Sequence, residues 1–175
     1  MCSRSFGNPV NSKAIIKDFI TEYAIRATEK VRQQNSRAQG IYIFLQTNRF
    51  RKEKQYSSGI MFGLNSPSCD TSIIIKLALR AIDQIYQSGY SYHKAGIMML
   101  DLIPSEIHQQ DLFQNTNYLL SDQRMGVIDF LNNKYGSGTI THGKIRQKDK
   151  SRWKSKSFYL SPRYTTQWDE LPQVS

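Results

Sequence analysis

The sequence predicts an α+β fold in which a four-stranded sheet carries two helices on one of its faces. Three observations predict it: two segments with helical spacing of apolar residues, four strand-like segments, and the order in which they follow one another. That order is β-α-β-β-α-β, the order of the split βαβ, ferredoxin-like arrangement. With both helices on one side of the sheet, the other face should be open. A small mixed region is expected after this domain.

Two segments have the apolar spacing of amphipathic helices. The first runs from Ser12 to Gln34 and follows a turn that offers Asn11 and Ser12 as the N-cap. The second follows Asp70, and Gly89 is its expected stop. The apolar positions are Ile16, Ile20, Tyr23, Ala24, Ala27 and Val31 in the first helix, and Ile74, Leu77, Ala78, Ala81, Ile82 and Ile85 in the second.

Four further segments, residues 2–7, 41–47, 56–64 and 94–102, have the composition or the alternation of strands. The third strand alternates most clearly. Its larger apolar residues are Ile60, Phe62 and Leu64, and between them lie Ser57, Gly59, Met61 and Gly63. Small side chains on the open face would let backbone N–H groups approach another surface closely. We interpret this strand as part of a contact surface, although glycines in a strand can also mark bulges.

Composition favours a polyanionic partner. The chain has 175 residues, with 24 Lys and Arg against 14 Asp and Glu, and its net charge is +10. Such an excess is typical of nucleic-acid binding, although a cationic but otherwise ordinary protein is the alternative. Cys2 and Cys69 form no CxxC pair, so zinc is not expected. No apolar run is long enough to span a membrane and no signal peptide opens the chain, so we expect a cytoplasmic protein.

We expect the open sheet face to bind nucleic acid through its phosphate backbone, without reading base sequence. Phosphate oxygens accept hydrogen bonds from backbone N–H groups and short hydroxyls, and they attract Lys and Arg. The candidate DNA-binding residues are Ser3, Arg4, Ser5, Arg49, Arg51, Lys52, Lys54, Ser57, Ser58, Gly59 and Lys94. Two alternatives stay open: the Arg49–Lys54 segment is a solvated loop, or the chain's own C-terminal region covers the sheet. Tyr56, at the entrance of the third strand, is expected to pack.

The chain changes character after Pro104. We divide it into a domain at 1–103, a linker at 104–120 and a C-terminal region at 121–175. A short helix is expected from Ser121 to near Gly136, followed by a strand at 139–145. Basic residues then occupy every second position from Lys144 to Lys156. This pattern is typical of a solvated hairpin or of a second electrostatic contact with DNA or a protein partner. The late aromatic residues Trp153, Tyr159, Tyr164 and Trp168 are expected to pack.

The linker carries a candidate clamp-binding peptide, Gln109-Gln110-Asp111-Leu112-Phe113. Its Gln109 amide offers both donors and an acceptor, and Leu112 and Phe113 would each contribute about 1.5–3 kcal/mol when buried in a partner's groove. The string is similar to the peptide that bacterial polymerases insert into the DNA sliding clamp. The alternative is that Leu112 and Phe113 pack against the preceding domain.

Six strings resemble, in order and spacing, the C-terminal part of UmuC-type Y-family DNA polymerases, the translesion enzymes of the bacterial SOS response. They are CSRSFG at 2–7, EYAIRATEKVR at 22–32, DTSIIIKLALRAIDQIY at 70–86, YHKAGIMMLDL at 92–102, QQDLF at 109–113 and LSPRYTTQWDELP at 160–172. The resemblance covers nearly the whole chain. It implies a little-finger domain at about 1–103 whose open face packs against primer–template or damaged DNA, and a family-specific C-terminal region.

The residues show no polymerase active site. Asp18, Asp83, Asp101 and Asp111 are scattered, and no pair near the start of a strand could hold two magnesium ions. The histidines His93, His108 and His142 form no cluster. In the family that the chain resembles, the metal-binding carboxylates lie in a palm domain ahead of the little finger. We therefore expect no catalysis, metal or cofactor in this chain, whether it is a fragment, an excised piece or a truncated product.

Two classes of function remain open. In the first, the chain is an accessory region that binds DNA and the sliding clamp. In the second, it is a protein-interaction module that competes for the clamp, a UmuD′-type subunit or the recombinase filament without touching DNA. An RNA-binding domain of the RNA-recognition-motif type is disfavoured, because the central strands lack the aromatic-rich string on which bases stack.

Overall fold

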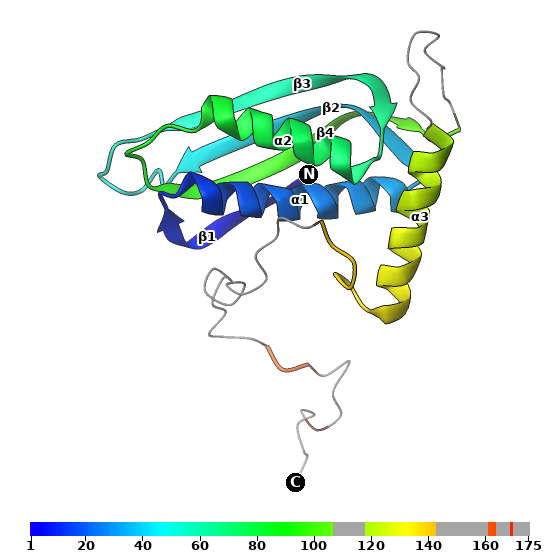
Figure 1. Ribbon diagram of the computed structural model, residues 1–175. Helices are drawn as coiled ribbons and strands as arrows, with labels where there is room; N and C mark the ends of the chain where they lie inside the picture. Colours follow the sequence, from blue (N-terminus) through cyan, green and yellow to red (C-terminus); the bar gives the residue numbers. More distant parts are fainter. Residues whose placement is uncertain (107–117, 143–160, 164–168, 170–175) are drawn as a thin grey trace.

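The computed structural model of the protein describes residues 1–106, 118–142, 161–163 and 169. Its elements are β1 (Cys2–Val10), α1 (Lys13–Gln33), β2 (Ser36–Thr47), β3 (Ser57–Ser68), α2 (Thr71–Ile85), β4 (Tyr92–Pro104) and α3 (Tyr118–Tyr135). Figure 1 shows α1 and α2 side by side over one face of the sheet. The predicted α+β class and the β-α-β-β-α-β order are confirmed.

The strands lie in the order β1-β4-β2-β3, and every neighbouring pair is antiparallel. A ferredoxin-like sheet has β1 and β3 as its inner strands, whereas here the inner strands are β4 and β2, so the expected ferredoxin-like pairing is wrong. The composition of β1 gives the reason. Its Ser3, Arg4 and Ser5 suit an edge strand, while the inner strands supply fully buried residues such as Ile43 and Ile97.

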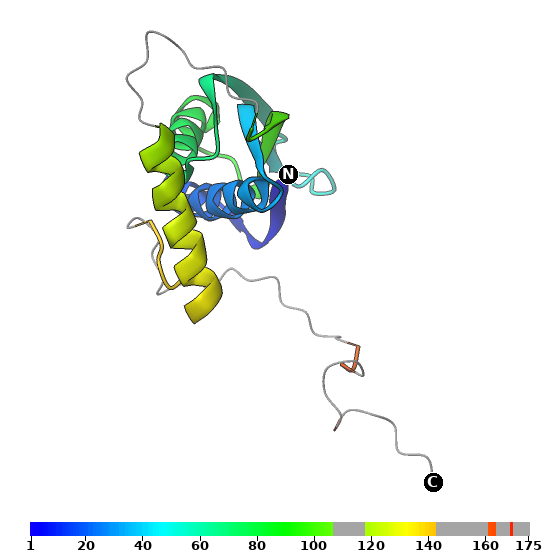
Figure 2. The same cartoon turned by 90° about the vertical axis from the view of Figure 1, so that its right-hand side faces the viewer.

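The core lies between the sheet and the two helices, as the predicted apolar stripes require. Ile16 and Ile20 of α1 and Ile74 and Ile82 of α2 are fully buried against the sheet. Burial of a side chain of this size contributes about 1.5–3 kcal/mol. This helix layer fixes the sheet and leaves its opposite face without a helix, which Figure 2 shows from the side.

The helix boundaries differ slightly from the prediction. The Asp70 carboxylate caps α2 by accepting a hydrogen bond from the backbone N–H of Ser72 at 2.7 Å, as expected. Ser12 stands at the N-cap of α1 but makes no side-chain cap bond. α2 ends at Ile85, earlier than the expected stop, and Gly89, with φ +88, forms the turn that precedes β4.

α3 lies across the ends of α1 and α2 and not over the open sheet face (Figures 1 and 2). The strand expected from residue 139 does not form in its described part. There the backbone N–H and C=O of Ile140 bond to the Asn132 side chain at 2.8 and 3.1 Å, so the chain folds back onto α3. The remainder of that expected strand, 143–145, lies outside the described residues. Within the described ranges, no helix has the length and apolarity needed to cross a membrane.

Candidate nucleic-acid interface

The side of the sheet that no described segment covers, which we call the open face, is defined by the register of its strands. Residues that pair across neighbouring strands share a face. The pairs of Gln46 with Ser57 and Lys94 therefore define one side of the sheet. The open face consists of Ser3, Ser5, Gly40, Tyr42, Phe44, Gln46, Ser57, Gly59, Met61, Gly63, Lys94, Gly96, Met98 and Leu100. None of these residues is acidic.

Five of the candidate DNA-binding residues from the sequence come together on the open face. They are Ser3, Ser5, Ser57, Gly59 and Lys94. They belong to three strands, the two edge strands β1 and β3 and the inner strand β4, so the sheet brings together residues that are far apart in the sequence. The predicted alternation of β3 is confirmed, because Ser57, Gly59, Met61 and Gly63 are all exposed.

Arg4 and Ser58 lie on the helix side of the sheet instead. Arg4 pairs with Ala95, and Ser58 pairs with Leu45, whose side chain is fully buried beneath the helices. Arg4 acts on Tyr23 of α1: burial raises the pKa of the Tyr23 phenol to about 12, and the nearby Arg4 opposes that rise. Successive residues of a strand point to opposite faces, so Ser3, Arg4 and Ser5 cannot share one surface.

Aromatic rings from the neighbouring strand pack over two glycines of the open face. A Cβ on Gly59 would lie 2.2 Å from the Tyr42 hydroxyl oxygen, and one on Gly96 would lie 2.6 Å from the Phe44 ring. Gly59 is exposed, but the Tyr42 ring occupies the space in which its side chain would lie, so a partner would approach this glycine beside the ring. Gly63 has no atom within 4 Å of such a Cβ, and its backbone stays accessible.

These rings also bear on the argument by which the sequence disfavoured an RNA-binding domain of the RNA-recognition-motif type. Tyr42 and Phe44 lie on the inner strand β2, face the open side and stack with their ring centroids 6.1 Å apart. The central strands were expected to lack an aromatic-rich string, but β2 places these two rings on the open face. Phe44 is only 7% exposed and Tyr42 is half-buried, so packing on the glycines already buries much of the ring surface that a base could stack on. Lys94 lies over the Phe44 ring, with its Nζ 5.9 Å from the centroid.

The β2–β3 loop, residues 48–56, adds positive charge at one end of the open face. It starts and ends beside the Gln46–Ser57 pair, and Figure 2 shows it projecting away from the helices α2 and α3. Its four basic residues, Arg49, Arg51, Lys52 and Lys54, are all exposed. Arg51 approaches Glu53 at 3.4 Å; the other three form no ion pair with any described residue. Together with Lys94, the loop makes this end of the face cationic.

Hydrogen bonds hold the β2–β3 loop at its base. The Gln55 side-chain amide lies within hydrogen-bonding distance of the carbonyl oxygens of Asn48 and Arg51, at 3.0 and 2.7 Å. Tyr56 packs on Tyr90 with ring centroids 4.8 Å apart and donates to the Ile85 carbonyl at 2.7 Å, so its expected packing role is confirmed. The loop is anchored, and its basic side chains project from an ordered backbone.

Phe50, which lies between Arg49 and Arg51 in this loop, was not among the predicted contact residues. Its side chain is 98% exposed. The signal in the sequence was a large apolar residue inside a run of charged ones, where no strand or helix periodicity explains it.

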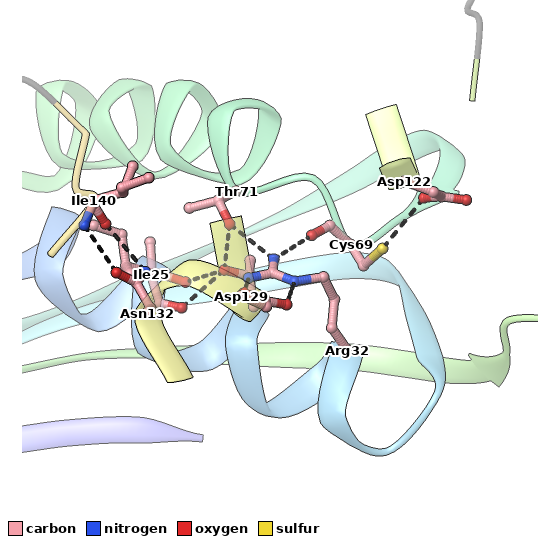
Figure 3. Close-up of polar contacts among 10 residues, drawn as sticks. Ile25, Arg32, Cys69, Thr71, Asp122, Asp129, Asn132 and Ile140 are labelled. Atoms are coloured by element: carbon pink, nitrogen blue, oxygen red, sulfur yellow. Dashed lines mark hydrogen bonds and ion pairs between the residues drawn. The ribbon is translucent and has the colours of Figure 1, made fainter. Parts of the chain in front are cut away.

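A second cluster of charges, the α3 contact, has a structural role. The Arg32 guanidinium forms a two-bond pair with Asp129 of α3 at 2.6 and 2.7 Å (Figure 3). It also donates to the Cys69 carbonyl and the Thr71 hydroxyl, both at 2.9 Å. Arg37 pairs with Asp122, the second carboxylate that α3 contributes. These contacts join residues up to 97 positions apart, which no local pattern could reveal.

Asp70 connects the same helix to the start of α2. Its carboxylate accepts hydrogen bonds from the Ser121 hydroxyl and from Arg124 at 2.7 Å. Burial by itself would raise the pKa of Asp70, but the bonds from Ser121 and the Ser72 backbone and the nearby Arg124 outweigh it and lower that pKa. The neighbouring Cys69 thiol has a raised pKa, because it is buried and lies beside Asp122.

Several predicted features fall outside the described residues. They include the clamp-type string with Gln109, Leu112 and Phe113, the basic alternation from Lys144 to Lys156, and the four late aromatic residues. All of these stay predictions. The described part of the C-terminal region, residues 118–142, attaches to the helix side through Arg32, Arg37 and Asp70 and leaves the open face uncovered. Among the described residues, no group of His, Cys, Asp and Glu could hold a metal ion.

Comparison with known proteins gives matches along nearly the whole chain. Residues 1–112 match the impB/mucB/samB family C-terminal domain, and residues 123–174 match a domain of unknown function (DUF4113). The chain is 35% identical over 176 residues to the protein UmuC of Salmonella typhimurium, an alignment that covers 99% of this chain and 41% of the relative. It is 33% identical to ImpB of Salmonella typhimurium and 30% identical to MucB of Escherichia coli, covering 98% and 97% of this chain and 40% of each relative. The chain thus spans about two fifths of the length of these relatives.

Proposed function

Since the chain belongs to the impB/mucB/samB family, whose C-terminal domain it contains, we propose that it is the non-catalytic, DNA-binding part of a translesion polymerase of the SOS response. One observation carries the proposal. A sheet face that no described segment covers, and that has no acidic residue, ends in a loop whose cations Arg49, Lys52 and Lys54 form no ion pair within the described residues. In this role the chain positions DNA, and the proposal assigns none of its residues to catalysis.

The contacts available on this face suit a phosphate backbone better than base edges. Ser3, Ser5 and Ser57 offer hydroxyls, Gly63 offers accessible backbone, and Lys94 offers an ammonium group. Hydrogen bonds of this kind fix the orientation of a duplex but carry no sequence information. The proposed binding is therefore sequence-independent and depends on salt, because neutralising phosphates releases counterions.

Neutralising the loop tests the proposal. A variant with Arg49→Ala, Lys52→Ala and Lys54→Ala should bind primer–template DNA more weakly, and the slope of log affinity against log salt concentration should shrink by about 3. The three side chains are exposed, so thermal stability should stay unchanged.

The matched control removes three exposed cations from the helix side, with Lys30→Ala, Lys76→Ala and Arg80→Ala. Both triple variants lose the same formal charge, so an effect of overall charge would appear equally in both. The proposal requires the loop variant alone to lose salt dependence. Equal losses in the two variants, or an affinity of the unmodified protein that ignores salt, would remove its support.

We further propose that the string from Gln109 to Phe113 binds the sliding clamp. Its support is the sequence pattern of the Gln109 amide followed by two adjacent large apolar side chains, Leu112 and Phe113. A Leu112→Ala, Phe113→Ala variant should lose capture by the clamp while its melting temperature stays nearly constant. A melting temperature several degrees lower would instead indicate that these side chains pack against the little-finger domain.

A second candidate function, a protein-interaction module without DNA affinity, is favoured by the outward side of α3. That side exposes large apolar residues, namely Leu120, Val127, Phe130 and Tyr135, although the opposite side of the helix is held by Asp122 and Asp129. Partners would include the clamp, a UmuD′-type subunit or a recombinase filament. This function requires clamp or subunit binding with no measurable affinity for primer–template DNA, which the salt titration above separates from the first.

A further inference from the structure

We propose that Phe50 stacks on an unpaired base of single-stranded DNA, next to the duplex that the open face holds. The inference rests on the proposed function, because it takes DNA as the partner of this surface. It goes beyond that function by assigning a contact residue that is neither a cation nor part of the sheet, and by naming the form of DNA that this residue recognises.

The exposure of Phe50 is the first observation. At 98%, it is the most exposed large hydrophobic side chain of the described residues, well above Met61 at 65% and Phe130 at 62%. Keeping such a side chain in water forgoes the free energy that its burial would contribute. The Phe50 side chain buries almost no surface against the described residues, so we infer that it contacts a partner outside the domain.

The second observation is that the backbone around Phe50 is fixed. The Asn48 side-chain oxygen accepts a hydrogen bond from the Phe50 N–H at 3.0 Å, and the Arg51 N–H donates to the Asn48 carbonyl at 3.3 Å. Gln55 holds the Asn48 and Arg51 carbonyls from the other side of the loop. An aromatic ring presented by an ordered loop loses less conformational entropy on binding than one on a loose segment.

The third observation is the charge around the ring. Arg49 and Arg51 flank Phe50 directly, Lys52 and Lys54 follow, and Glu53 is the one acidic residue of the loop. Single-stranded nucleic acid is bound by this combination, in which cations follow the backbone and an aromatic side chain stacks on a base. A basic protein surface would be repelled by the same loop.

The energetics favour a single strand over a duplex. Inserting a ring between stacked base pairs first requires their unstacking, which costs free energy, whereas stacking on a free base gains free energy without that cost. The loop leaves the sheet beside the Gln46–Ser57 pair, at one end of the open face (Figure 2). A duplex lying on that face would bring its single-stranded continuation towards the loop.

The test compares three DNA probes: a blunt duplex, the same duplex with a single-stranded overhang, and that overhang with its bases replaced by abasic sites. Phe50→Ala should weaken binding to the overhang probe by about tenfold and to the blunt duplex by less than about twofold. Abasic sites should weaken the unmodified protein by a similar factor and leave the Phe50→Ala variant unaffected. Phe50→Trp should retain binding.

Phe130→Ala is the matched control, since it removes a second exposed phenylalanine, on α3, and should change no DNA affinity. If Phe50→Ala binds the overhang probe as the unmodified protein does, the stacking role is overturned, while salt-dependent duplex binding would leave the proposed function intact. If no probe binds, both fall. If Phe50→Ala keeps its DNA affinity but no longer binds the sliding clamp, Phe50 is a protein contact, and this result also overturns the inference.

Discussion

The β2–β3 loop and the α3 contact are both rich in basic side chains, but they use them in opposite ways. At the α3 contact, Arg32 and Arg37 each pair with a carboxylate of α3. In the loop, Arg49, Lys52 and Lys54 form no ion pair with any described residue. The 24 Lys and Arg side chains therefore include some that hold the fold together and others that remain available to a partner. Composition alone could not make that division.

The largest expected effect separates these two sets of cations. Arg32→Met leaves Asp129 without its partner and removes the donor to the Cys69 carbonyl and the Thr71 hydroxyl, so it should lower the free energy of unfolding by about 3 kcal/mol. Arg49→Met should change it by less than about 0.5 kcal/mol, because the side chain is exposed.

Urea unfolding followed by circular dichroism measures both variants, and DNA titration should rank them in the reverse order. Equal losses of stability would show that the division between structural and available cations is wrong.

The next effect concerns how the open face is built. Gly96→Ala places a Cβ 2.6 Å from both the nearly buried Phe44 ring and the Ser3 Cβ, and such overpacking should cost about 1–3 kcal/mol. Gly63→Ala meets no atom within 4 Å and is the matched control, with a change expected below about 0.5 kcal/mol. Thermal unfolding of the two variants measures the difference. Equal melting temperatures would mean that Phe44 does not depend on Gly96.

Acidification should weaken the α3 contact before it affects the open face. The pKa of Asp70 is lowered below its ordinary value of 3.8, so its contribution to stability is present above that value and is lost as the pH falls through the lower folded-state pKa. The difference in melting temperature between the unmodified protein and Asp70→Asn should therefore be constant near neutral pH and shrink below about pH 4. A difference that persists at lower pH would mean that the Asp70 charge plays no part in the contact.

The smallest expected effect is a loosening of the loop. Gln55→Ala removes an exposed amide that spans the loop, so global stability should fall by no more than about 1 kcal/mol. Exchange of the Phe50 and Arg51 amide hydrogens should become faster, and affinity for DNA with an overhang should fall by about twofold to threefold. Unchanged exchange would indicate that Gln55 does not order the loop.

The sequence predicted those parts of the molecule that local patterns encode. Helical spacing located α1 and α2, and the period-two alternation of β3 correctly placed Ser57, Gly59 and Gly63 on the open face. Alternation also shows why Arg4 was misplaced: it was grouped with Ser3 and Ser5 although a strand turns adjacent residues to opposite faces.

The features that were not predicted involve contacts between distant segments. Which strand lies beside β1 depends on pairing across the whole domain, and the cover of Tyr42 over Gly59 depends on the β2–β3 register. The pairing of Arg32 with Asp129 depends on where α3 docks. Phe50 was not predicted for another reason: the basic residues around it indicated a charged loop, and an apolar residue inside such a loop has no periodic pattern to mark it.

The central claim, that the open face and its adjoining loop contact DNA, is tested most directly by mapping amide chemical shifts by NMR during titration with primer–template DNA. The account predicts shifts at Ser57, Gly63, Lys94 and the β2–β3 loop, and none at Asp122 or Asp129 of α3. Shifts confined to α3 or to the outer surfaces of α1 and α2 would contradict it.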